Sequence, residues 1–84
     1  MSYSVLILPR AQAELSSLPV GAYEKVKLAI RELAENPRPQ GCLKLRGREG
    51  WRIRIGDYRV IYEIRDKIRV IIVVHIGHRR DVYR

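Results

Sequence analysis

Hydrophobic and polar residues alternate along the stretch WRIRIGDYRVIY at residues 51–62. Trp51, Ile53 and Ile55 alternate with two arginines, Gly56 and Asp57 interrupt the pattern, and the alternation then resumes. Strict alternation over such a run is typical of a half-buried strand, because successive side chains of a strand point to opposite faces. A Gly-Asp pair between two such runs indicates a β-hairpin.

A two-residue turn in this hairpin fixes which residues face each other. The expected pairs are Ile55 with Tyr58, Arg54 with Arg59, Ile53 with Val60 and Trp51 with Tyr62. One face is then apolar, while the other holds guanidinium groups directly opposite each other. Like charges opposed across a sheet are destabilising by roughly several tenths of a kcal/mol or more. We therefore expect this face to bind an anion, with phosphate as the leading candidate.

Hydrophobic spacing elsewhere predicts one further strand and two helices. Tyr3 to Leu8 is typical of a short strand, since it is rich in apolar and β-favouring residues. A short helix is expected from about Pro9, with Ala11, Leu15 and Leu18 on one side, and Pro19 ends it. A second helix is expected from Gly21 to Glu35, because Ala22, Val26, Ala29, Ile30 and Leu33 form one stripe before Asn36-Pro37 ends it.

The C-terminal half predicts the remaining strands. Cys42 to Arg46 is a candidate short edge strand, and Asp66-Lys67 is expected to form a second turn. Ile68 to Ile76 is apolar on both faces beyond Arg69, which predicts a central strand covered on both sides. The expected order is β-α-α-β-β-β. This describes one α+β domain over residues 1–84, with a mostly antiparallel sheet and two helices packed on one of its faces.

Charge is distributed unevenly along the 84 residues. Residues 1–37 contain four basic and four acidic residues, whereas residues 38–84 contain 13 basic and 5 acidic ones, so the whole net charge of +8 (13 − 5) lies in the second part. A neutral half joined to a basic half indicates a scaffold that presents a polyanion-binding surface. Cys42 is the single cysteine, which excludes an intramolecular disulfide, and with two histidines it argues against structural zinc.

Several motifs together resemble the RelE/ParE superfamily of toxins from bacterial and archaeal toxin–antitoxin pairs. They are L-x-x-N-P at Leu33 to Pro37, L-x-G at Leu45 to Gly47, WRIRIGDYRVIY at Trp51 to Tyr62, and HRRDVYR at His78 to Arg84. The resemblance covers essentially the whole chain and implies a RelE-like fold. RelE-like members cleave mRNA on the ribosome, whereas ParE-like members poison DNA gyrase and lack the catalytic basic residues.

The resemblance implies a set of site residues. Arg52 and Arg54 match the paired basic positions before the turn, and Lys44 and Arg46 match basic positions that flank the cleft. Arg59 matches the arginine that follows the tyrosine of the hairpin. Arg79 matches the arginine near the end of the last strand, and Tyr83 matches the tyrosine near the C-terminus. Arg52, Arg54, Lys44, Arg46 and Arg80 are expected to bind RNA, and Arg59, Arg79, His78 and Tyr83 to carry the chemistry.

The chemistry of these residue types supports part of that assignment. Arginine forks bind phosphate oxygens in pairs, so Arg54, Arg59 and Arg79 are candidates for holding the scissile phosphate. Arginine is a poor proton donor or acceptor, which leaves His78 and Tyr83 as the candidate acid and base. Tyr83 has two other interpretations, stacking on an exposed base and acting as a structural anchor. Some relatives carry lysine at the positions of Arg52 and Arg54, where only lysine can act as a base.

Structural interpretations stand beside these functional ones. Basic residues that alternate along a strand are often only a solvated face. His75 lies inside an apolar strand and is expected to be packed, while Trp51, Tyr58, Tyr62 and Cys42 are expected in the core. His78, Arg79 and Tyr83 beside the arginines favour an enzyme over a gyrase-binding protein. A transcription regulator is disfavoured, because no helix-turn-helix pattern is present.

The expected function is that of a ribosome-dependent endoribonuclease that cleaves mRNA in the ribosomal A site without a metal or cofactor, with a gyrase-inhibiting ParE-like toxin as the alternative. The expected partners are the ribosome, mRNA and an acidic, partly disordered, RelB-like antitoxin through which the complex binds operator DNA. The chain has no leader pattern and no apolar run near about 18 residues, so no membrane segment is expected and the cytoplasm is the expected location.

Overall fold

The computed structural model describes residues 2–78. The elements follow in the order β1 (Ser4–Ile7), α1 (Pro9–Ser16), α2 (Val20–Leu33), β2 (Leu43–Lys44), β3 (Trp51–Ile55), β4 (Tyr58–Arg65) and β5 (Val70–His78). The α+β class is therefore confirmed. The candidate edge strand is present as the two-residue β2, which lengthens the expected order to β-α-α-β-β-β-β. Both boundaries of α2 lie within two residues of the expected ones.

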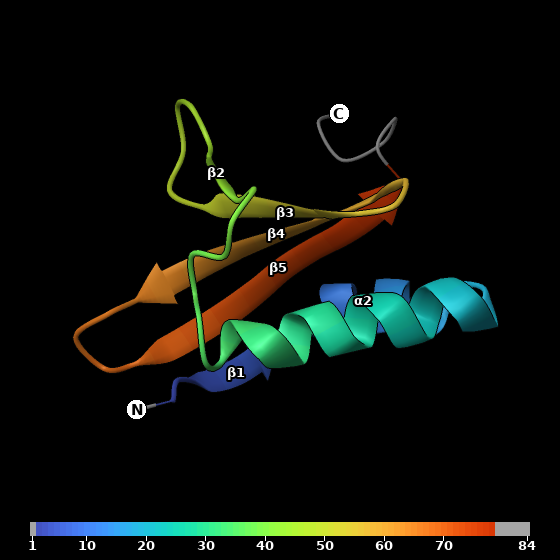
Figure 1. Ribbon diagram of the computed structural model, residues 1–84, viewed down its shortest axis with the longest axis horizontal. Helices are drawn as coiled ribbons and strands as arrows, with labels where there is room; N and C mark the ends of the chain where they lie inside the picture. The colour runs from blue at the N-terminus through green and yellow to red at the C-terminus, as the bar shows by residue number, and fades with distance from the viewer. Residues whose placement is uncertain (1, 79–84) are drawn as a thin grey trace.

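The five strands form one sheet in the order β1-β5-β4-β3-β2 (Figure 1). β1 runs parallel to β5, and the other three pairs are antiparallel, so the sheet is mostly antiparallel as predicted. The register of the β3–β4 hairpin is the predicted one, including Arg54 opposite Arg59. Gly56 has a φ of 58°, as the first central residue of a type II′ turn requires, and Asp57 completes the two-residue connection.

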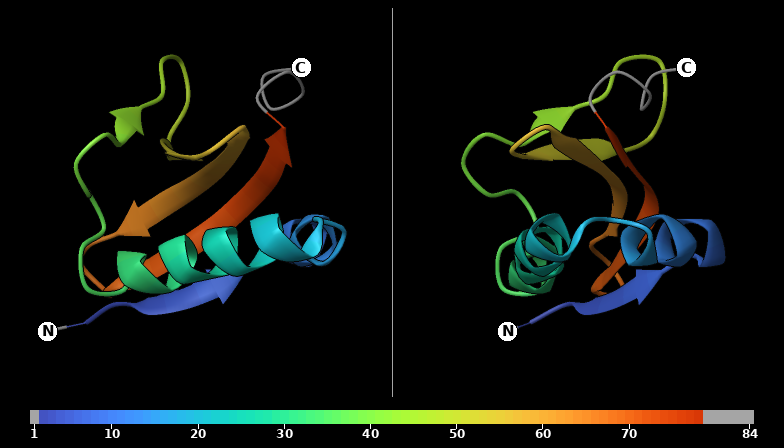
Figure 2. Two further views of the ribbon diagram at one scale, coloured as in Figure 1. Left: turned by 45° about the vertical axis from the view of Figure 1, so that its right-hand side comes forward. Right: turned by 90° about the vertical axis from the view of Figure 1, so that its right-hand side faces the viewer.

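Both helices cover the same face of the sheet (Figure 2). The stripe of α2 packs there because its residues recur at spacings of three and four, and it meets the apolar side chains of β3, β4 and β5. The buried core consists of Ala11, Leu15, Val26, Ile30, Leu33, Ile53, Val60, Tyr62, Ile71, Val73 and Ile76. The helices thus pack on one face of the sheet only. On the other face Ile61 and Arg59 are nonetheless buried, at 1% and 6% exposure.

β5 lies inside the sheet but is covered on one face only, so the prediction of a strand covered on both sides is wrong. Ile71, Val73 and Ile76 face the helices and are buried, whereas Ile72 and Val74 are only half-buried. Ile68 lies before the strand and is 70% exposed. The apolar run predicts more coverage than β5 has, because both helices pack on the same face of the sheet. No helix of the described residues covers the other face.

Tyr62 fastens the segment after α2 to the sheet. Its side chain is fully buried, and its hydroxyl donates a hydrogen bond of 2.7 Å to the carbonyl oxygen of Pro37. Burial raises the pKa of Tyr62 well above its ordinary value, because the ionised form would lose its hydration. The predicted core role of Tyr62 is therefore confirmed.

A polar cluster of Tyr3, Arg38 and Asp66 joins three separate segments. The Tyr3 hydroxyl donates to Oδ1 of Asp66 at 2.7 Å, and Nη2 of Arg38 donates to Oδ2 at 2.9 Å. The hydrogen bonds from Arg38 and Tyr3 lower the pKa of Asp66, and the same bonds raise the pKa values of Arg38 and Tyr3. The cluster ties the N-terminal strand and the segment after α2 to the β4–β5 turn.

Within residues 2–78, neither helix is both long enough and apolar enough to cross a membrane.

Candidate functional site

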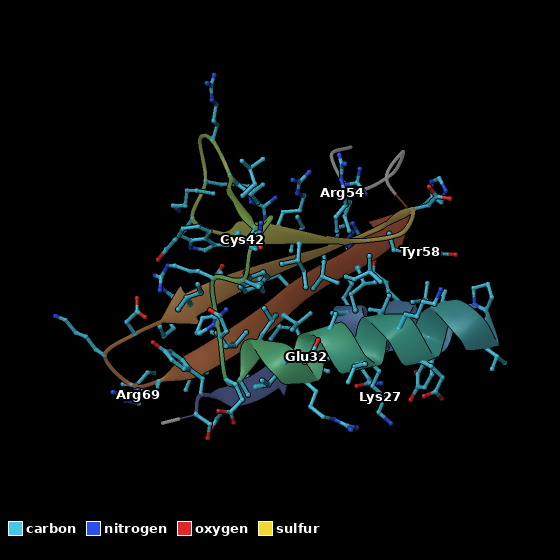
Figure 3. The ribbon with its side chains drawn as sticks, viewed as in Figure 1. Lys27, Glu32, Cys42, Arg54, Tyr58 and Arg69 are labelled. Carbon is cyan, nitrogen blue, oxygen red and sulfur yellow. The ribbon has the colours of Figure 1, made fainter. Side chains whose placement is uncertain are left out.

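The face of β3 and β4 opposite the helices carries Arg52, Arg54 and Arg59, and we call it the arginine face. These residues alternate with Ile53 and Val60, which belong to the core, so their side chains start on the other side of the sheet. Figure 3 shows Arg54 pointing away from α2. The structure thus brings together three of the predicted site residues on one surface.

Arg54 and Arg59 differ strongly in exposure although they face each other. Arg54 is exposed, whereas Arg59 is only 6% exposed and its Nη1 lies 3.4 Å from the carbonyl oxygen of Tyr58. On its other side Arg59 faces Gly77 of β5, which has no side chain to occupy that position. Placing a second guanidinium group beside a buried one is unfavourable, and a bound anion would offset this cost.

Acidic residues do not neutralise Arg52 or Arg54 within the described part of the chain. The carboxylates form their ion pairs elsewhere: Glu49 and Glu63 contact Arg65 at 2.8 Å and 2.7 Å, and Asp66 contacts Arg38. Nε of Arg52 is buried and has no hydrogen-bond partner among residues 2–78. Arg52 and Arg54 therefore retain their positive charge, as a phosphate-binding surface requires.

Lys44 lies away from this face. Lys44 pairs with Trp51, so its side chain starts on the helix side of the sheet, and its Nζ lies 5.8 Å from the centre of the Trp51 ring. Arg46 is exposed in the segment between β2 and β3. The RNA contact predicted for Lys44 would therefore involve a different surface from the arginine face.

His78 ends β5 opposite Tyr58, and the two rings meet edge to face with centres 5.9 Å apart. By its register His78 belongs to the helix side of the sheet, because Gly77 is the residue that faces Arg59. The structure thus places His78 at the end of the sheet and not on the arginine face. The predicted residues Arg79, Arg80 and Tyr83 lie outside the described residues, so the expected acid–base arrangement stays a prediction.

A contact between Glu14 of α1 and the end of β5 was not predicted from the sequence. Glu14 Oε1 accepts a hydrogen bond of 2.9 Å from the backbone N–H of Ile76, and Nδ1 of His75 lies 2.8 Å from Oε2. This contact lies where β1 has ended and its pairing with β5 stops at Val73. His75 is packed, as expected, and the carboxylate of Glu14 supplies an acceptor that a neighbouring strand would otherwise provide.

The geometry therefore suits the binding of a multiply charged anion more directly than proton transfer. The arginines supply forked donors for phosphate oxygens, but they cannot exchange protons near neutral pH. Within residues 2–78, no group of three or more His, Cys, Asp and Glu side chains is arranged to hold a metal ion.

The fold and this face together define a class of protein: a small α+β domain whose sheet is covered by helices on one side and presents arginines on the other. Comparison with known proteins agrees with this class. The family model of the ParE toxin of type II toxin–antitoxin systems matches residues 5–83. The chain belongs to this RelE/ParE family of type II toxins, which confirms the resemblance seen in the sequence.

Relatives match the chain over its whole length. It is 32% identical to the putative toxin RelE1 of Methanocaldococcus jannaschii, covering 100% of this chain and 98% of that protein. It is 30% identical to the toxin RelG of Mycobacterium tuberculosis, covering 100% and 99%. Among solved structures, the archaeal RelE–RelB complex of Pyrococcus horikoshii has a TM-score of 0.84 at 32% identity, covering 98% of this chain and 100% of that chain.

Proposed function

We propose that this toxin is an endoribonuclease that cleaves mRNA in the ribosomal A site and so stops translation. The observation that carries the proposal is the opposition of Arg54 and Arg59 across the hairpin, on a face where Arg52 and Arg54 form no ion pair with the described carboxylates. Two guanidinium groups that start from opposed strand positions could bind the oxygens of one phosphate group. The relatives named RelE support the same activity.

The proposed reaction uses the substrate's own 2′-hydroxyl group as the nucleophile. Its oxygen forms a bond to phosphorus, the bond from phosphorus to the 5′-oxygen breaks, and a 2′,3′-cyclic phosphate and a 5′-hydroxyl result. Arg54, Arg59 and Arg79 hold the phosphate and stabilise the charge that develops on its oxygens. A base takes the 2′-hydroxyl proton and an acid protonates the 5′-oxygen, and we assign these two roles to Tyr83 and His78 without ordering them.

A second candidate is inhibition of DNA gyrase. It is favoured by the matching family model, which is that of the ParE toxin. In that case the arginine face would be a binding surface, and the toxin would carry out no chemistry of its own.

We also propose the partners of the toxin. The net charge of +8 favours an acidic antitoxin with a segment that folds on binding. The solved complex of a relative contains a partner protein, RelB. The toxin–antitoxin complex would bind operator DNA through the antitoxin. Free toxin would act in the cytoplasm, where mRNA and ribosomes are found, with Arg52, Arg54, Lys44, Arg46 and Arg80 contacting RNA.

The first test is primer extension on a reporter mRNA, with the toxin induced in cells and added to the purified RNA with and without ribosomes. Cuts within the translated frame that appear only with ribosomes are expected. Arg59→Ala and Arg79→Ala should abolish both cleavage and growth arrest, and Tyr83→Phe should reduce cleavage if the hydroxyl transfers a proton.

Arg65→Ala is the matched control, because Arg65 lies on the same strand as Arg59 but is paired with Glu49 and Glu63. It should leave cleavage nearly unchanged. Growth arrest with intact mRNA would instead support the gyrase alternative, and continued cleavage by Arg59→Ala would refute the phosphate-binding role.

A further inference from the structure

His75 lies on the same side of the sheet as the arginine face, although it is part of an apolar strand. Val73 and Ile76 both belong to the core on the helix side, and they are three positions apart, where regular alternation would require an even spacing. The pairing of β4 with β5 shifts its register at this point, as a β-bulge does. Val74 and His75 therefore both start on the side opposite the helices.

Strand pairing puts His75 beside the residues proposed to bind phosphate. Its partner on β4 is Ile61, and the partner of Ile61 on β3 is Arg52. The next row on the same side of the sheet consists of Arg54, Arg59 and Gly77. Diagonal neighbours on adjacent strands lie about 7–8 Å apart, within reach of long side chains. Ile61 is buried, so a ligand that contacts both His75 and Arg59 would lie over Gly77, which has no side chain.

The carboxylate of Glu14 fixes the orientation of the His75 ring. Oε1 of Glu14 accepts the backbone N–H of Ile76, which places the carboxylate at the edge of β5, and Oε2 lies 2.8 Å from Nδ1 of His75. An ionised carboxylate can only accept hydrogen bonds, so Nδ1 of His75 carries a proton. Nε2, the other ring nitrogen, makes no hydrogen bond to the described residues, and the side chain is 15% exposed.

The charges around His75 make its protonation sensitive to a bound anion. Arg59 of β4 and Arg52 of β3 lie on its side of the sheet and oppose a further positive charge. Glu14 of α1 favours that charge, although Arg10 also contacts its carboxylate, at 3.3 Å. A phosphate group beside Arg59 would add a second negative charge and so favour protonation. Protonated histidine donates from both nitrogens, one N–H to Glu14 and the other to the phosphate.

We propose that His75 is a further RNA-contacting residue of this toxin, which takes up a proton when RNA binds, and that Glu14 is its positioning residue. Nε2–H of the protonated ring donates to a phosphate oxygen next to those that Arg59 contacts. The inference rests on the proposed function, because its ligand is the RNA backbone, but it gives His75 no part in proton transfer during cleavage. Affinity for RNA should then increase as pH falls from about 8 to about 5, the range in which histidine gains its charge.

The first test measures binding of a single-stranded 2′-O-methyl oligoribonucleotide, which has no free 2′-hydroxyl group and is not cleaved by the proposed reaction. Fluorescence anisotropy at constant salt should show that the original toxin binds it about tenfold more tightly at pH about 5.5 than at pH about 8. His75→Gln keeps a polar side chain that gains no charge, so its affinity should change by less than about twofold. An equal pH dependence in the two proteins would overturn the proposal.

Two variants of α1 provide a matched pair, because Arg10 and Glu14 form one ion pair and only Glu14 contacts His75. Glu14→Gln removes the charge that favours the protonated ring, so the increase in affinity should move to lower pH. Arg10→Gln keeps the carboxylate and should retain the pH dependence of the original toxin. Equal effects of the two variants would refute the positioning role of Glu14. Circular dichroism checks that both variants are folded.

A measurement on the original toxin keeps the proposal testable if the variants do not fold. NMR of the His75 ring should show that it titrates at higher pH with the oligonucleotide bound than without it. An unchanged titration would overturn the proposal. Cleavage of the reporter mRNA separates this inference from the proposed function. Intact mRNA with proton uptake at His75 would refute the cleavage activity and support this site, whereas cleavage without proton uptake would refute this site alone.

Discussion

Arg54 and Arg59 face each other directly across the β3–β4 hairpin, with Arg54 exposed and Arg59 only 6% exposed. The pair lies beside a turn that holds the two strands in fixed register, so the two charges cannot move apart by strand slippage. Retaining two guanidinium groups in this arrangement has a cost in stability. The arrangement is understandable if an anion is bound there during function.

Arg54→Gln should therefore increase stability while weakening RNA binding. Removing one of two opposed charges is expected to raise the free energy of unfolding by roughly 0.2–1 kcal/mol. Loss of one phosphate contact should reduce the slope of log affinity against log salt concentration by about 0.7 for single-stranded RNA. Urea unfolding measures the first effect, and fluorescence anisotropy over a series of salt concentrations measures the second.

Arg65→Gln is the comparison for this variant. Arg65 contacts Glu49 and Glu63, so its replacement should lower stability slightly and leave the salt slope unchanged. An Arg54→Gln protein that is less stable than the original would contradict the repulsion argument.

The hairpin was predictable because two independent signals agreed. Alternation assigned the faces of residues 51–55 and 58–64, and the Gly56-Asp57 turn fixed the register, so each constrained the same pairing. The coverage of β5 was not predictable, because an apolar run does not say how many helices are available to cover it. The face on which Lys44 lies was not predicted, since β2 is two residues long, too short to show a pattern.

The common face of the three hairpin arginines was predictable to the same extent as their strands. Arg52, Arg54 and Arg59 share a face because strand alternation requires it. The contact between Glu14 and the end of β5 depends on residues that lie 62 positions apart in the chain. Local patterns carry no information about such a contact, since it arises from how α1 packs against the sheet.

Tyr62→Phe should lower the free energy of unfolding by about 1 kcal/mol or more, because the Pro37 carbonyl would lose its hydrogen bond in a buried setting. Tyr58→Phe is the control, since the Tyr58 hydroxyl makes no hydrogen bond to the described residues. Urea unfolding at neutral pH compares the two variants. Equal stabilities would show that the Tyr62 hydroxyl contributes nothing measurable.

The same residue should affect stability at alkaline pH. Burial raises the pKa of Tyr62 in the folded state, so its contribution is complete below the ordinary tyrosine pKa of about 10 and is lost as pH rises toward the folded value. The original protein should therefore lose stability more steeply above pH about 10 than Tyr62→Phe does. Thermal unfolding over this pH range tests the difference in slope.

Glu14→Ala should loosen the end of β5. The variant removes the acceptor for the Ile76 N–H, and we expect exchange of that amide to quicken by about tenfold, with a loss of roughly 1–2 kcal/mol in stability. Arg10→Ala removes the exposed ion-pair partner of Glu14 but keeps the carboxylate, and it should leave this amide protected. Equally fast exchange in both variants would assign the effect to α1 as a whole.

Asp66→Asn should destabilise the protein at neutral pH and not in acid. Hydrogen bonds from Arg38 and Tyr3 lower the pKa of Asp66 in the folded state, so its contribution is present above the ordinary pKa of about 3.9 and is lost as pH falls through the lowered value. Urea midpoints of the original protein should thus exceed those of Asp66→Asn at pH about 7, and the two should converge in strong acid. Asp57→Asn, in the exposed hairpin turn, is the control, and its urea midpoint should equal that of the original protein at either pH. A difference between the original protein and Asp66→Asn that stays constant at every pH would mean that Asp66 acts through its shape and not its charge.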